Sequence, residues 1–326
     1  MALKHLKYHK HQIIIAIFWF TLSLLLHAPL YISNAIASEN TAIIIQSQQI
    51  AAYNEAIKGF KEGCKGKNIS IKAIYDLKAD TEEGKRVIKN IKDNEIKPDI
   101  ILAVGVLAAS LVKEQFSNIP IIFCMVINHE RFNLQGANIT GISSEASVED
   151  QFAILKELLG TYKNVGVIYD PAKTGKIVSE ATSVSKNFEF NLIKSEVASD
   201  TEVALALKDI INKIDALWII PDSTVITKKS LDTISKTTIE HHLPIICTSE
   251  AIVKAGALVS VSPDYKYTGI QASQLAQMLL NNPTTASLGI RQPDRLKLTV
   301  NTQTAEIIGI NLSSFQSNQD VILYPK

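Results

Sequence analysis

The residues best placed to do chemistry in this chain are acids and short polar side chains that follow apolar runs. The densest group is Asp222-Ser223-Thr224, and further acids stand at Asp170 and Glu250. A carboxylate at Asp170 or Asp222 can receive an ammonium group, while hydroxyls and strand-end N–H groups can receive a carboxylate. The candidate ligand-binding residues are Ser47, Gln48, Gly105, Asn128, Asp170, Asp222, Ser223, Thr224, Ser249 and Glu250.

These residues also have a purely structural interpretation. Ser, Thr, Asp and Asn between a strand and a helix often cap the helix, because their side chains accept bonds from its first N–H groups. The sequence leaves both interpretations open, and we expect one residue of Asp222-Ser223-Thr224 to be a cap.

The sequence lacks the common signatures of catalysis and of bound cofactors. It has no GxGxxG after a strand, no GxxxxGK[ST] and no GxSxG, and neither CxxC nor HExxH occurs. His241 and His242 fit the end of a helix, where the helix dipole favours histidine. We therefore expect no metal, no cofactor and no catalytic residues, with an enzyme on the same scaffold as the weakest alternative.

The composition is that of a folded globular protein. The chain has 326 residues, is 46% apolar and 20% charged, and carries a formal charge of +1. These values exclude a wholly disordered or collagen-like chain and argue against nucleic acid as a partner. Three cysteines are too few for a disulfide-built scaffold, and Cys124 and Cys247 stand in apolar runs typical of a core.

Strand-like and helix-like segments alternate from residue 41 onwards. Apolar strands separated by helices of about 10–15 residues are typical of parallel sheets covered on both faces. Ser147 is the expected N-cap of one helix, and Trp218 is an expected core residue. We expect strands at 42–45, 69–75, 99–104, 120–126, 165–169, 190–196, 216–220, 244–247, 257–261 and 297–300, and helices at 51–65, 81–94, 107–116, 148–159, 176–187, 201–212, 223–241, 265–280 and 302–308.

The two halves of this pattern repeat each other. Asn118-Ile-Pro-Ile-Ile122 in the first half matches His242-Leu-Pro-Ile-Ile246 in the second. The repeat predicts an α/β fold of two Rossmann-like lobes, at 41–140 and 145–260, with part of 262–312 returning to the first lobe. Ligands of open parallel sheets bind beyond the carboxyl ends of the strands, so we expect a cleft between the lobes.

The N-terminus has the order of a secretory signal peptide. Three lysines precede an apolar run, Ile13 to Leu26, and small residues follow at Ala35 and Ala37. We expect residues 1–37 to be removed after Ala37, which leaves a formal charge of −2. An uncleaved N-terminal anchor is the alternative.

Several stretches resemble one family. Ala56-Ile-Lys-Gly-Phe-Lys-Glu-Gly63 is similar to its "GFxxGL" pattern, Gly136-Ala-Asn-Ile-Thr-Gly141 to "GGNVTG", and Val253-Lys-Ala-Gly-Ala-Leu258 to "VKRGAL". The family comprises the substrate-binding proteins of ABC transporters with the type I periplasmic binding fold, and the branch is associated with tryptophan and related amino acids. The resemblance covers about residues 41–312, but the sequence departs from the family pattern at 47–50, 105–106 and 248–252.

The resemblance implies a periplasmic or secreted protein that captures a small polar solute, such as an amino acid, by hinge closure of two lobes. Its partners would be that solute and an ABC permease and ATPase at the inner membrane. The alternative is a ligand-sensing module that signals to a membrane partner.

Overall fold

The computed structural model describes residues 39–94, 97–160, 164–282, 287–313, 315 and 321–325. The expected signal peptide lies outside these residues. Within the described ranges, no helix combines the length and the apolar character needed to cross a membrane.

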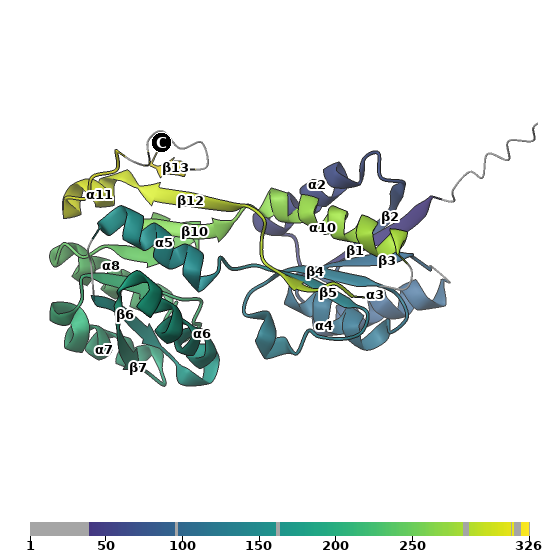
Figure 1. Cartoon of the computed structure of the whole chain (residues 1–326). Coiled ribbons are helices and arrows are strands. Elements are labelled where there is room, and N and C mark those ends of the chain that lie inside the picture. The colour runs from purple at the N-terminus through teal and green to yellow at the C-terminus, as the bar shows by residue number, and fades with distance from the viewer. Residues whose placement is uncertain are drawn as a thin grey trace, which may run out of the picture. The chain divides into compact units, whose positions relative to one another are not determined.

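The first sheet has six strands, which are all parallel (Figure 1). Its order is β11-β5-β4-β3-β1-β2, so five strands have the doubly wound order 2-1-3-4-5 and β11 extends the β5 edge. Their bounds are β1 Asn40–Gln46, β2 Ile69–Asp76, β3 Ile100–Val104, β4 Ile121–Val126, β5 Ile139–Ser143 and β11 Gly289–Arg291.

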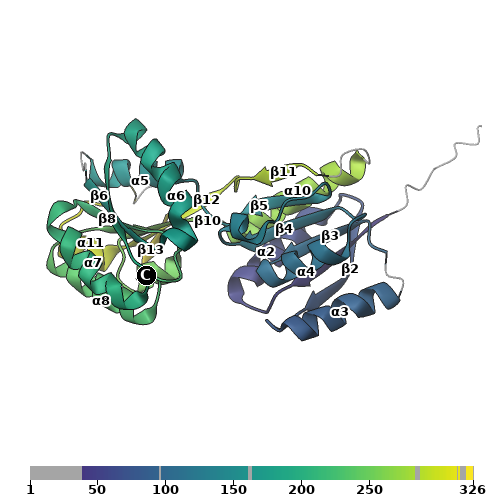
Figure 2. The same cartoon turned by 90° about the horizontal axis from the view of Figure 1, so that it is seen from below.

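Helices cover both faces of this sheet because β1 is apolar on both sides. Ala42 and Ile44 pack toward α2 (Ala51–Cys64) and α10 (Tyr265–Asn281), whereas Ile43 and Ile45 pack toward α3 (Thr81–Asp93) and α4 (Val106–Gln115). Figure 2 shows α3 and α4 together on one face. The sheet and these four helices form what we call the first lobe.

Helices α2 and α10 cross at unusually short range. A Cβ atom on Gly59 would lie 1.8 Å from the carbonyl oxygen of Lys266, and one on Gly269 would lie 1.9 Å from that of Ala56. The two glycines therefore allow a backbone approach that larger residues would block.

The second sheet repeats the strand order of the first. It runs β13-β12-β10-β9-β8-β6-β7, in which β6 to β10 are parallel and β12 is antiparallel to β10. The bounds are β6 Asn164–Tyr169, β7 Asn191–Glu196, β8 Ala216–Ile219, β9 Ile245–Cys247, β10 Val259–Pro263, β12 Leu296–Asn301 and β13 Val321–Tyr324.

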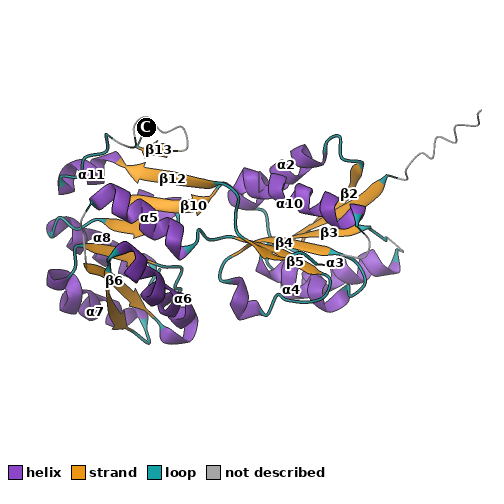
Figure 3. Cartoon of the chain, viewed as in Figure 1, coloured by secondary structure: helices purple, strands orange, loops and turns teal. Residues whose placement is uncertain are grey.

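This sheet is also covered on both faces, and together with its helices it forms the second lobe (Figure 3). Ser147 accepts a bond from the Asp150 N–H and caps α5, which confirms the expected N-cap. Trp218 is buried in the core as expected, and all three cysteines are buried and free. The helices are α5 Val148–Leu159, α6 Pro171–Val184, α7 Val203–Ile210, α8 Lys228–Glu240, α9 Glu250–Lys254 and α11 Thr302–Ile308.

The chain passes between the two sheets three times, through residues 144–147, through Asp264 and through 292–295. The α/β fold with two Rossmann-like sheets flanked by helices is therefore confirmed.

Several local predictions were wrong. The strands β5, β11 and β13 and the short helix α9 were not expected. The helix expected at 223–241 begins at Lys228 because Thr227 is its N-cap, so the cap expected within Asp222-Ser223-Thr224 is not the cap of this helix. The helix expected at 176–187 is α6, which begins at Pro171 because Asp170 is its N-cap.

Candidate ligand-binding site

Asp222 is held by three donors of the protein itself. Its side chain is fully buried beyond the end of β8. Oδ2 accepts the backbone N–H of Asp170 at 2.8 Å and the hydroxyl of Thr174 at 2.5 Å, while Oδ1 accepts the N–H of Thr224 at 2.8 Å. This carboxylate therefore ties the ends of β6 and β8 together.

Asp170 and Thr224 belong to the same network. Asp170 caps α6 by accepting the N–H of Ala172 at 2.9 Å, and its Oδ2 accepts the Thr224 hydroxyl at 2.8 Å. The Thr224 oxygen in turn accepts from Lys173 Nζ at 2.5 Å. The Thr224 hydroxyl lowers the pKa of the Asp170 carboxyl, which stabilises its charged form. Ser223, between the two buried residues, is exposed.

Ser47 and Gly105 come together at the ends of β1 and β3. Ser47 Oγ accepts the N–H of Ala108 at 3.0 Å inside the first turn of α4. Gly105 has a φ of +88°, and a Cβ atom there would lie 2.6 Å from both Ser47 Oγ and Tyr53 Oη. Glycine is thus required by both conformation and space. Gln48, the next predicted residue, is half-buried.

Ser249 and Glu250 stand at the start of α9. Ser249 caps this helix by accepting the N–H of Ala251, and Glu250 is exposed and pairs with Lys254 at 2.6 Å. The capping interpretation is therefore confirmed for Ser249, as it is for Asp170.

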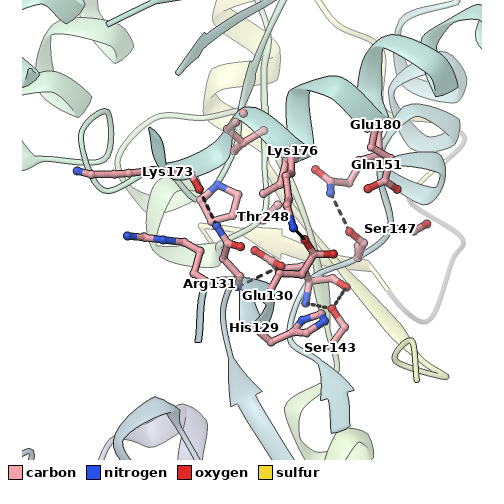
Figure 4. A pocket seen from close by; sticks show the side chains of 18 of the residues that line it. His129, Glu130, Arg131, Ser143, Ser147, Gln151, Lys173, Lys176, Glu180 and Thr248 are labelled. Atoms are coloured by element: carbon pink, nitrogen blue, oxygen red, sulfur yellow. Dashed lines mark hydrogen bonds and ion pairs between the residues drawn. The ribbon is translucent and has the colours of Figure 1, made fainter. Parts of the chain in front are cut away.

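A pocket of about 370 Å³ lies elsewhere, among loops from both lobes (Figure 4). Of the ten predicted residues, only Asn128 lines it. Its wall consists of strand-end loops after β4, β5, β6, β8 and β9, together with turns of α5 and α6. The lining residues are 128–131, 143, 145–148, 151, 171–173, 175–177, 180, 218, 220–221, 248 and 292.

Asn128 joins the two lobes at this pocket. It has a left-handed conformation with a φ of +50°, which asparagine tolerates better than most residues. Its side-chain amide donates to the carbonyl oxygen of Lys173 at 3.0 Å, and its backbone N–H donates to Glu145 Oε2 at 3.3 Å. Asn128, which lies in the loop after β4, thus contacts both α6 and the segment that connects β5 to α5.

Glu145 is a pocket acid with one carboxylate oxygen that is buried and unpaired among the described residues. Its Oε1 is buried and has no hydrogen-bond partner in the described structure. Burial raises the pKa of this carboxyl to about 7, and the nearby acids Glu130 and Glu180 also raise it, against the bond from Asn128. At neutral pH the group therefore exchanges readily between its neutral and charged forms.

The other pocket charges are of both signs. Glu130 pairs with Lys176 at 3.1 Å, as the dashed line in Figure 4 shows. Burial lowers the pKa of His129, so its imidazole is held neutral, and its buried Nδ1 has no partner in the described structure. Ile177, Trp218 and Ile220 add apolar surface. Such a wall suits a ligand with charged groups and an apolar body.

Sequence reasoning missed Glu145, Lys176 and His129. Glu145 follows the unexpected strand β5, so its position at a strand end was hidden, while His129 directly follows the predicted Asn128. In the described residues no group of three or more His, Cys, Asp and Glu side chains could hold a metal ion.

We expect the replacement Glu145→Gln to change how stability depends on pH. The carboxyl pKa rises from 4.5 to about 7 on folding, so its contribution to stability is present below pH 4.5 and is lost as pH rises through 7. The full difference corresponds to about 3 kcal/mol. Urea unfolding at about pH 5 and pH 8 measures the free energy of unfolding of the variant and of the parent. The variant should be more stable than the parent at pH 8, and this difference should be smaller at pH 5. An equal effect at both pH values would contradict the assignment.

Comparison with known proteins identifies the family of this chain. The family model described as "ABC transporter substrate binding protein" matches residues 42–318. The chain belongs to this family. Solved structures with the type I periplasmic binding fold share its architecture, which agrees with the resemblance found in the sequence.

Three similar proteins illustrate the relationship. A tyrosine-binding protein of Clostridioides difficile is 26% identical over 65% of this chain, and the match covers 63% of that protein's length. The ligand-free, open structure of a substrate-binding protein with adhesive properties from Clostridium difficile has a TM-score of 0.73 and 21% identity, covering 87% of this chain and 98% of that one. An ABC domain in complex with L-Trp from Streptococcus pneumonia has a TM-score of 0.62 and 20% identity, covering 87% and 100%.

Proposed function

We propose that this substrate-binding protein is exported and captures an amino acid or a related small polar solute for an ABC permease and its ATPase. The observation that carries the proposal is the pocket whose lining comes from strand-end loops of both lobes. Parallel α/β sheets bind ligands at such ends. A volume of about 370 Å³ lies within the usual range for small-molecule pockets.

The mixed wall supports an amino acid as the ligand. Lys176 and Arg131 offer positive charge toward a carboxylate, Glu145 offers an unpaired oxygen, and Trp218 and Ile220 offer apolar contact. Two similar proteins are a tyrosine-binding protein and an ABC domain in complex with L-Trp. The ligand would bridge both lobes and shift the population toward a closed form, with the three chain passages acting as the hinge.

A thermal-shift panel of the L-amino acids and several pentoses tests this function. We expect at least one amino acid, present at about 100 times its Kd, to stabilise the protein by about 2.7 kcal/mol and raise its Tm by several degrees. Small-angle scattering should then show a smaller radius of gyration with that amino acid bound. A panel in which no amino acid raises the Tm contradicts the proposal.

The replacement Asn128→Ala should weaken binding of that amino acid about tenfold, because it removes a lobe-to-lobe hydrogen bond at the pocket. Asn133→Ala is a matched control, since Asn133 also has a left-handed backbone, with a φ of +48°, and does not line the pocket. Calorimetric titration of both variants separates the effect of the lost hydrogen bond from the effect of placing alanine at a left-handed backbone position. Equal losses would assign the effect to backbone strain.

A further inference from the structure

Glu145 has one carboxylate oxygen that the protein leaves without a partner at the pocket. The residue lies in the segment that joins β5 to α5, where the chain first passes between the lobes. Oε2 accepts a single long bond of 3.3 Å from the Asn128 N–H, and Oε1 accepts none from the described residues although it is buried. Leaving such an acceptor unpaired is costly, so a ligand donor that reaches it gains affinity.

The surrounding charges do not neutralise this carboxyl. From the loop after β4, Glu130, Arg131 and the neutral His129 line the same pocket, and from α6 so do Lys173, Lys176 and Glu180. Lys176 is paired with Glu130, and Lys173 donates to Thr224. Glu130 and Glu180 thus add negative potential near Glu145, whose own segment provides no basic residue.

We propose that Glu145 recognises a protonated amine of the ligand, and that binding of this amine is coupled to release of a proton from Glu145. The inference rests on the proposed function and names the group that the pocket selects. A neutral carboxyl at Glu145 loses its proton to solvent when the ammonium arrives, and the resulting carboxylate accepts a charge-assisted N–H bond at the free oxygen. No other residue changes its protonation state.

The coupling predicts a pH-dependent affinity with a definite sign. Only the charged carboxylate pairs with the ammonium, and in the free protein about half of the groups are charged at pH 7. Affinity for an amine ligand should therefore rise about thirtyfold between roughly pH 5.5 and pH 8 and then level off. At pH 7 binding should release about half a proton per ligand.

Calorimetric titrations with L-tyrosine and L-tryptophan test this inference, alongside their deaminated analogues, 3-(4-hydroxyphenyl)propanoate and 3-(indol-3-yl)propanoate. If another amino acid is the ligand found by the panel, it is compared with its own deaminated acid. We expect the deaminated acids to bind at least about thirtyfold more weakly at pH 8, since they leave Glu145 unpaired. Titration in buffers of different ionisation enthalpy counts the released protons.

The variant Glu145→Gln should bind the amino acid at least about tenfold more weakly at pH 8 and show an affinity that changes less than about threefold with pH. Glu149→Gln is the matched control, because it makes the same change four residues away at an exposed position outside the pocket. It should keep the full pH dependence. The melting temperature of each variant confirms that it is folded.

The possible failures are distinct. Binding that is indifferent to the amine, or a pH dependence that survives in Glu145→Gln, overturns this inference and leaves the proposed function standing. A panel in which no amino acid binds overturns both.

Discussion

Replacing Gly269 by alanine should strongly destabilise the first lobe. The new Cβ atom would lie 1.9 Å from the carbonyl oxygen of Ala56 and 2.6 Å from the backbone nitrogen of Phe60, so α10 and α2 must move apart. Backbone atoms cannot rotate away as a side chain can, and we expect a loss of about 3 kcal/mol or more. Thermal unfolding should show a Tm lower by about 6–12 °C.

The variant Gly175→Ala is the matched control. Gly175 also lies within a helix, α6, but the nearest atom to its added Cβ is Pro171 Cβ at 4.0 Å. Alanine there should be neutral or stabilise the protein by about 0.5–1 kcal/mol, because it lowers the conformational entropy of the unfolded chain. Equal shifts in the two variants would refute the close crossing.

Replacing Asp222 by alanine should cost about 3 kcal/mol or more, because leaving a buried donor without its acceptor costs about 1–3 kcal/mol and three donors are affected. The change leaves the N–H groups of Asp170 and Thr224 and the hydroxyl of Thr174 without their acceptor. Because the ends of β6 and β8 would loosen together, ligand affinity should also fall, although Asp222 does not line the pocket.

Ser223→Ala provides the comparison for Asp222. The two residues are neighbours, yet Ser223 is exposed, so its replacement should change stability by less than about 0.5 kcal/mol. Urea unfolding of both variants measures the difference. If Asp222→Ala proved as mild as Ser223→Ala, the network would not stabilise the second lobe.

The architecture could be predicted because its strands are long apolar runs. Strands such as Ile100–Val104 are buried at every position, so an unbroken apolar run in the sequence predicts burial on both faces. Strand β5 was not predicted because Thr140, Gly141 and Ser143 interrupt its apolar character. Thr140 is nevertheless buried, where its hydroxyl accepts the N–H of Leu288 from a distant segment that no local pattern indicates.

The candidate site was only partly predictable for the same reason. The rule that ligands bind at strand ends selected Asn128, which does line the pocket, but it also selected Asp170 and Ser249, which cap helices. A strand-end residue can face a pocket or turn back to the backbone, and the choice depends on tertiary contacts. Glu145 was missed because the strand before it was missed.

The place of α10 in the fold affects the order in which the two lobes can fold during synthesis. Ala272, Leu275, Ala276 and Leu279 cover the face of the first sheet that carries Ile44, Leu102 and Ile122. The lobe that leaves the ribosome first is therefore completed only after nearly the whole second lobe has been made. A chain stopped before residue 265 would expose that apolar face to water and favour aggregation, so this protein is committed to folding late, as an almost complete polypeptide.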